Sequence, residues 1–238
     1  MTVLAADFTP FGPSHWGALA VFALGAAALV VFGRGLATES ARLRGSRILA
    51  VLLLVFHLPM QLYVLLPSEF GIGHSLPFQL SDLAWIAAVI ALWTHARWAL
   101  ALTYYWNLTL TVQALVTPVL RGPDFPDFGF LMFFSQHIFE VWAAVFLIWG
   151  LRLRPDWWSY RLTLVVTATW AVVMSVFNPL AGTNYGFLSE KPPVGTLLDQ
   201  MGGWPWYLFL GYALLSGAWA LMTWPWVVIT ARSRQPAG

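Results

Sequence analysis

Long apolar stretches separated by short polar stretches run along the whole chain. Seven of them approach the roughly 20 residues that an α-helix needs to cross a bilayer. They cover residues 15–33, 47–66, 76–95, 98–119, 128–150, 160–179 and 204–229. The connections between them are short, and no internal repeat or low-complexity tract is visible. The pattern predicts an all-α, polytopic membrane protein in which residues 1–238 form a single domain of seven transmembrane helices.

Composition agrees with this interpretation and removes several function classes. Hydrophobic residues make up 59% of the chain and charged residues 9%, whereas soluble domains carry about 25% charged residues. The chain has no cysteine, so disulfides, thiolate catalysis and cysteine metal ligands are excluded. Basic residues lie between the apolar stretches rather than in one patch, so no nucleic-acid partner is expected. Lys191 is the only lysine and lies in a polar loop, so no lysine-bound cofactor is expected inside the helices. No cofactor is predicted.

The distribution of basic residues predicts the orientation of the helices. Cytoplasmic loops of membrane proteins carry an excess of Lys and Arg. Only Arg121 and Lys191 fall on one side of the predicted bundle. The other side holds ten arginines, at positions 34, 42, 44, 47, 97, 152, 154, 161, 232 and 234. We therefore expect the N-terminus outside and the C-terminus in the cytoplasm.

The longest loop, residues 180–203, is rich in Gly and Pro but also contains Tyr185, Phe187 and Leu188. A merely solvated loop would be more polar. We expect this loop to fold back as a lid over the outer mouth of the bundle, with Asn184 and Tyr185 facing inward and Lys191 near lipid head groups. The alternative is an ordered cap without a function.

Few ionisable residues lie inside the apolar segments, away from their ends: Asp82, Glu140, His57 and His137, joined by the polar residues Gln79, Ser81, Asn107, Gln113 and Asn178. Such groups are costly in hydrocarbon and normally face the bundle interior or a water-filled cavity. At a rise of about 1.5 Å per residue, Ser81 and Asp82 should lie roughly 8–9 Å below the outer surface. His57 and His137 should lie at about 14 Å, and Asn107 and Glu140 at about 18 Å. These depths predict a polar cavity open to the outside.

Helical spacing groups some of these residues. His137 and Glu140 are three positions apart and share a helix face. Asn107 lies on a stripe with Thr103 and Thr111, and Gln113 lies on a neighbouring stripe with Thr109 and Thr117. Two plainer interpretations stay open. Hydroxyl residues also serve helix packing in membranes, and the ionisable residues can form a mutually satisfied polar network that locks the bundle.

Several segments resemble a bacterial family of integral membrane proteins, the YwaF-like family. The resemblance lies in HSLPFQLSDLA from His74, YYWNLTLTVQALVTP from Tyr104, FFSQHIFE from Phe133, and NPLAGTNYGFLSEKPP with WPWYL between Asn178 and Leu208. It covers about two thirds of the chain and leaves out the first helix. That family is distantly similar to eukaryotic seven-helix membrane proteins assigned to phospholipid acyl transfer. In those proteins an intramembrane cysteine and a histidine are the catalytic pair, and the matching positions here are Ser81 and His137.

The resemblance implies a location in a bacterial plasma membrane. It also implies acyl transfer from a membrane lipid, with serine in place of the family's usual cysteine. Such chemistry needs a nucleophile, a base and a group that orients the base. Ser81 is the candidate nucleophile and His137 the candidate base, with Glu140 or Asp82 orienting the imidazole. Asn107, Gln79 or Gln113 are candidate oxyanion donors, and His57 is a further candidate for substrate binding.

Two other functions stay open from the sequence. His57, His137, Glu140 and Asp82 are the residue types of a mixed metal site, although no helix carries a pair of histidines four residues apart, and we predict no metal. A transporter or receptor would use the same cavity and lid to bind a small polar solute or a lipid without catalysis. Against transport, no inverted repeat and no paired Gly/Pro break near the midplane is visible.

Overall fold

A computed structural model describes residues 7–118, 120, 122–192 and 197–232 of the chain. In these residues the chain is helical, apart from turns and an isolated β-bridge between Asp7 and Pro123. The α-helices are α1 (Pro13–Gly35), α2 (Glu39–Tyr63), α3 (Leu80–Thr94), α4 (Arg97–Trp106), α5 (Val112–Val116), α6 (Phe128–Val145), α7 (Trp157–Ala181) and α8 (Trp206–Arg232). The π-helices are η1 (Asn107–Thr111) and η2 (Phe146–Gly150), and the 3₁₀ helices are η3 (Tyr185–Phe187) and η4 (Leu197–Met201).

Five of the helices described here are long and apolar enough to cross a membrane. They span Pro13–Gly35, Glu39–Tyr63, Phe128–Gly150, Trp157–Ala181 and Trp206–Ala231. Large apolar side chains on them are exposed, such as Leu24 at 72%, Leu180 at 82% and Leu221 at 67%. Exposing so many apolar side chains to water would be unfavourable, whereas exposing them to lipid is not. The prediction of an all-α, multi-pass membrane protein is therefore confirmed.

The other two predicted segments are not single α-helices of full membrane-spanning length in the structure. The helix α3 has 15 residues, about 22 Å at the usual rise, and is shorter than a typical membrane span. The run from Arg97 to Val116 is continuous but passes from α4 through the π-turn η1 into α5. Residue 119, at the end of the predicted fourth segment, lies outside the described residues, as do Arg121, Arg234 and loop residues 193–196.

By its internal contacts the chain divides into two compact units. The first contains the described residues of Met1–Met60 together with Leu83–Leu153, and the second contains Gln61–Asp82 together with the described residues of Arg154–Gly238. The expected single domain therefore stays a prediction.

In the first unit, small residues let helices pack closely. One face of α3 buries Ala84, Ala87, Ala88 and Ala91, at the spacing of successive turns. The helix α1 lies along α6 and η2, and a Cβ atom added to Gly33 would lie 2.8 Å from the Cα atom of Gly150. Close approach through small residues is a common way for helices to associate in a membrane. This packing supports the first unit's core around Leu53, Phe146 and Leu147.

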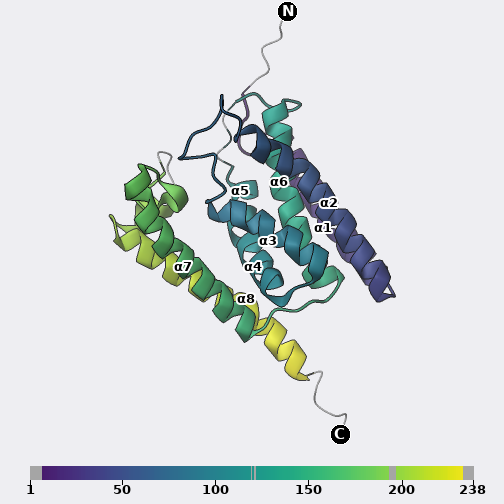
Figure 1. Ribbon diagram of the computed structural model, residues 1–238. Coiled ribbons are helices and arrows are strands. Elements are labelled where there is room, and N and C mark those ends of the chain that lie inside the picture. The colour runs from purple at the N-terminus through teal and green to yellow at the C-terminus, as the bar shows by residue number, and fades with distance from the viewer. Residues whose placement is uncertain (1–6, 119, 121, 193–196, 233–238) are drawn as a thin grey trace, which may run out of the picture. The chain divides into compact units, whose positions relative to one another are not determined.

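In the second unit, α7 and α8 lie side by side, drawn in green and yellow in Figure 1. Asp156 caps α7 by accepting a hydrogen bond from the Ser159 N–H at 2.9 Å. Gly182 ends the helix with φ of 64°, a left-handed conformation that glycine adopts without steric cost. The chain then turns back toward the segment before α3.

The start of α3 differs from the predicted segment. The sequence predicts a helix from residue 76, but α3 begins at Leu80. The Asp82 carboxylate accepts a hydrogen bond from the Gln79 N–H at 2.9 Å, which is one half of a capping box. Ser81 is therefore the second residue of the helix, whereas its estimated depth of roughly 8 Å assumed a helix that begins at residue 76. Pro77 lies inside the turn that precedes the cap.

Candidate functional site

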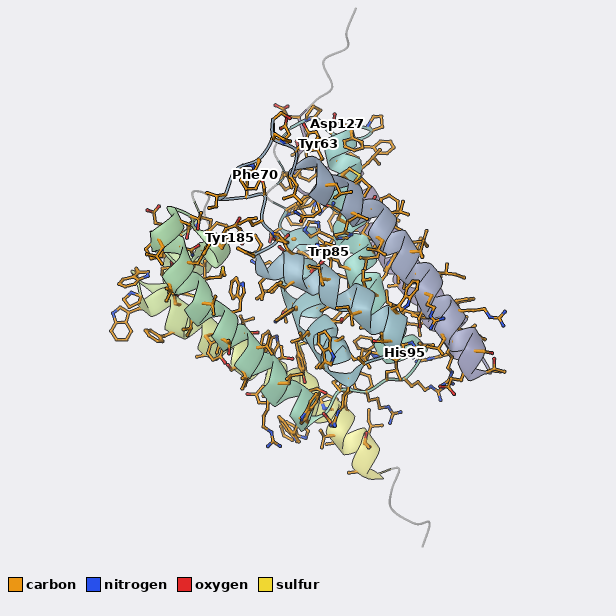
Figure 2. The ribbon with its side chains drawn as sticks, viewed as in Figure 1. Tyr63, Phe70, Trp85, His95, Asp127 and Tyr185 are labelled. Carbon is orange, nitrogen blue, oxygen red and sulfur yellow. The ribbon has the colours of Figure 1, made fainter. Side chains whose placement is uncertain are left out.

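The first unit contains a buried pair of ionisable side chains. His57 on α2 and Glu140 on α6 are 5% and 4% exposed, and His57 Nε2 lies 2.7 Å from Glu140 Oε1. The His57 ring also lies against Trp85 of α3, with 5.3 Å between ring centroids, and Figure 2 labels Trp85 on that helix. An ionisable group in such surroundings is stable only when it is paired.

The hydrogen bonds of His57 determine how many protons the pair holds. Its Nδ1 lies 3.0 Å from the carbonyl oxygen of Leu53, and because a carbonyl only accepts, Nδ1 must carry a hydrogen. One further hydrogen then lies between Nε2 and the Glu140 carboxyl group. It belongs either to an imidazolium beside a carboxylate or to a carboxylic acid beside a neutral imidazole, and the pair is neutral overall in both arrangements.

A π-turn brings two more polar side chains to this pair. Asn107 and Thr111 are the first and last residues of η1, and they are 0% and 2% exposed. The Thr111 hydroxyl donates to Glu140 Oε2 at 2.8 Å and also lies 3.2 Å from Asn107 Oδ1. Asn107 Nδ2 is buried and has no partner among the described residues. Such turns occur often at functional sites.

His137 lies on the same helix as Glu140 but does not contact it through a hydrogen bond. Its Nδ1 donates to the Phe133 carbonyl oxygen at 2.7 Å, and its ring lies against Phe133 with centroids 4.4 Å apart. In the neutral imidazole the lone pair therefore lies on Nε2, which has no hydrogen-bonding partner among the described residues. His137 is half-buried. The expectation that Glu140 orients this imidazole is wrong, since the Phe133 carbonyl oxygen holds Nδ1 and no hydrogen bond joins His137 to Glu140.

Ser81, Asp82 and Gln79 belong to the second unit. Ser81 is exposed in the first turn of α3, and Asp82 serves as part of the helix cap. The Gln79 side-chain oxygen accepts a hydrogen bond from the Gly186 N–H at 2.9 Å, which leaves its amide N–H groups as the possible donors. Because Ser81 and His137 lie in different units, the Ser81–His137 pair stays a prediction.

The loop after α7 is held to the segment before α3 within the second unit. Tyr185 is fully buried, and its hydroxyl donates to the Ile72 carbonyl oxygen at 2.6 Å; Figure 2 shows Tyr185 beside the end of α7. Asn178 accepts from the Tyr185 N–H and donates to the Tyr185 carbonyl oxygen. Burial of Tyr185 raises the pKa of its phenol. The loop is thus an anchored element, while its predicted function as a lid stays a prediction.

The other loop residues have different surroundings. The side chain of Asn184 binds the loop's own backbone at Ser189 and Glu190, and its inward orientation stays a prediction. Lys191 Nζ lies 3.9 Å from Asp199 and 5.4 Å from the centroid of the Tyr207 ring. Gln113 is exposed on α5 and takes no part in the buried network. In the part of the chain that the structure describes, no three His, Asp or Glu side chains gather as metal ligands would, so the mixed metal site is not formed there.

The comparisons with known proteins give one match. A family model with the description "TMEM164 family" matches residues 10–223, which is most of the chain. The chain belongs to the TMEM164 family. No curated protein and no solved structure matches it. Membership in this membrane protein family agrees with the apolar helices, whereas the resemblance to the YwaF-like family and to acyltransferases stays an expectation.

In this member of the TMEM164 family, sequence reasoning found the residues of the buried network but not how they pair. His57 and Glu140 are 83 positions apart, and no local spacing connects them. The stripe of Thr103, Asn107 and Thr111 was the available signal, because it marks a polar face at the depth of Glu140. The π-turn η1, which places Thr111 against the carboxylate, has no signature in the sequence.

Proposed function

We propose that this protein is a membrane lipid acyltransferase or a lipase-like hydrolase in which His137 is the general base and Ser81 the nucleophile. The observation that carries the proposal is the state of the His137 ring. Its Nδ1 hydrogen is fixed on the Phe133 carbonyl oxygen, so the lone pair lies on Nε2, which no described residue engages. A general base needs such a nitrogen.

The position of Ser81 supports the proposed role of nucleophile. It lies in the first turn of α3 and is exposed. The first backbone N–H groups of a helix have no intrahelical acceptor, and this end of the helix carries a partial positive charge. An oxyanion formed next to Ser81 would be stabilised there, and the free amide hydrogens of Gln79 would add to this effect.

In the proposed reaction, Ser81 Oγ attacks the ester carbonyl of a phospholipid while His137 Nε2 takes the hydroxyl proton. The ester bond breaks, the alcohol oxygen of the lysophospholipid takes that proton, and an acyl-serine ester remains. Water or the hydroxyl of a second lysophospholipid then accepts the acyl group. The acceptor decides whether the protein is a hydrolase or a transferase.

The reaction is tested with the full chain reconstituted in vesicles whose phospholipid carries an isotope-labelled acyl chain. We expect mass spectrometry to detect labelled fatty acid or, when lysophospholipid is added, labelled diacyl product. Vesicles without protein measure the background. If neither product exceeds that background with choline, ethanolamine or glycerol head groups, the proposed function is wrong.

A second candidate function is the binding of a small polar solute by a transporter or receptor. The buried network favours it, because Asn107 Nδ2 is a donor without a partner among the described residues and lies beside the His57–Glu140 pair. A ligand oxygen would satisfy that donor. Solute uptake or binding that depends on Asn107, in a protein without acyl transfer, would select this function.

We propose further that seven segments cross a bacterial plasma membrane with the N-terminus outside. The run from Arg97 to Val116 and the short α3 would be the two additional crossings. A fluorescent reporter that matures only in the cytoplasm should fluoresce when fused after Gly238. The same reporter fused after Asp124, in a loop predicted to lie outside, should stay dark. Fluorescence in the reverse pattern would contradict this topology.

A further inference from the structure

A hollow in the first unit lies at the termini of four helical runs. The helix α1 ends at Gly35, α2 begins at Glu39, α3 ends at Thr94 and η2 ends at Gly150. The hollow has a volume of about 330 Å³ and is lined by Ala37, Glu39, Arg42, His95, Leu151 and Leu153. Figure 2 labels His95 at the end of α3. Glu140 lies ten residues before Gly150, about 15 Å away along the helix, so the hollow is separate from the buried network.

The surroundings of the hollow are typical of the interface between membrane and water. The Arg47 guanidinium lies over the Trp93 ring, 5.5 Å from its centroid, and Arg34 Nε donates to the Trp149 carbonyl oxygen at 3.4 Å. Tryptophan and arginine concentrate where helices leave the hydrocarbon. Phospholipid head groups occupy that level, so they are the most abundant ligands within reach of the hollow.

The polar side of the hollow has one cationic and one anionic side chain, and the two form no ion pair with each other. Arg42 Nε donates to the Leu36 carbonyl oxygen at 3.2 Å, which fixes the side chain and leaves the other guanidinium N–H groups available. Glu39 lies one helical turn before Arg42 and makes no ion pair with any described residue. The N-terminus of α2, with its partial positive charge, lies at the same place.

His95 completes the wall as an imidazole held in place. Its backbone has φ of 54°, a left-handed conformation that non-glycine residues adopt only at a steric cost. Its Nε2 lies 2.7 Å from the hydroxyl of Ser46, which is fully buried. Desolvation lowers the pKa of His95, against the opposing effect of Glu39. The apolar part of the lining consists of Leu151, which is buried, and Leu153, which is half-buried.

We propose that this hollow binds the head group of a phospholipid that carries both a phosphate and a primary ammonium, as phosphatidylethanolamine does. The phosphate would lie at Arg42 and the first turn of α2, where charge-assisted hydrogen bonds are available. The ammonium would donate to Glu39, and the glycerol carbons would pack on Leu151 and Leu153. An anionic head group without an ammonium would meet Arg42 but would be repelled by Glu39. The site is independent of the function proposed for His137.

The proposal is tested with the full chain in phosphatidylcholine nanodiscs, to which short-chain lipids are added and counted by native mass spectrometry. We expect dihexanoyl phosphatidylethanolamine to bind about tenfold more tightly than dihexanoyl phosphatidylglycerol, the effect of one charge-assisted contact. Soluble glycerophosphoethanolamine should bind more weakly than the lipid. Equal affinity for the two lipids in the unaltered protein would overturn the proposal.

Variants test whether the head group binds in this hollow or binds to basic surface residues in general. R42Q should weaken phosphatidylethanolamine binding about tenfold, and E39Q should remove the preference over phosphatidylglycerol. R44Q is the matched control, because Arg44 is exposed on the same helix and does not line the hollow. A37F, which fills the hollow without changing any charge, should also weaken binding. Equal losses in R42Q and R44Q, or unchanged binding in A37F, would overturn the proposal.

Discussion

Replacing His137 with alanine should lower the rate of acyl release or transfer by about two to four orders of magnitude, the range that a general base contributes. The ring nitrogen that would take the proton from the nucleophile is then missing. H137Q should be almost as inactive, because a glutamine amide nitrogen has no lone pair that accepts a proton. The measurement is the initial rate of labelled product formation in reconstituted vesicles.

The matched control for this experiment is H74A. His74 is an exposed histidine whose Nε2 lies 3.2 Å from the Glu69 carbonyl oxygen, and its loss should leave the rate unchanged. S81A should abolish product formation as H137A does. If H137A keeps the rate of the unaltered protein while it remains folded, His137 is not the base, and the proposed Ser81–His137 pair is wrong.

Removing one member of the His57–Glu140 pair should destabilise the fold by about 3–5 kcal/mol, because the remaining partner is left unpaired in an apolar interior. E140A should show the larger loss, since the Thr111 hydroxyl also loses the shorter of its two hydrogen bonds. E140Q should lose less, because a glutamine amide can donate to His57 Nε2 and accept from the Thr111 hydroxyl. Reversible unfolding in detergent or bicelles measures these changes in the free energy of unfolding.

The double variant H57L/E140L provides the control. It removes both ionisable groups and replaces them with apolar side chains, a change that is often neutral or stabilising for a buried pair. It should therefore be more stable than H57A or E140A alone. In H57A, the fraction that remains folded should keep most of its acyl-transfer rate. If all single variants unfold like the unaltered protein, the pair does not stabilise the bundle.

Much of the helical framework follows from the sequence, because a bilayer requires long apolar stretches and the stretches are visible. The structure places a helical run at every predicted segment. The limits of α2 and α3 were harder to predict. The helix α2 begins at Glu39, where Thr38 Oγ1 accepts from the Ala41 N–H at 3.2 Å, because a capping hydroxyl outweighs the polarity of the arginines that follow.

The pairing of the buried residues could not be predicted in the same way. His57 and His137 have similar estimated depths, and both are within reach of Glu140 by that measure. Positions three apart on a helix differ by about 60° around its axis, so His137 and Glu140 can share a face and still have different neighbours. Glu140 is buried while His137 is half-buried. Only the packing of α2 against α6 decides which imidazole meets the carboxylate.

The close packing of α1 against η2 restricts how a lipid can reach the first unit from the side. The backbones at Gly33 and Gly150 approach so closely that a single added carbon at Gly33 would lie 2.8 Å from the other chain segment. An acyl chain is about 4 Å wide, twice the contact radius of carbon, and does not fit between them. Sideways diffusion from the bilayer into this unit is therefore blocked along that seam, and a lipid tail must pass between other helices.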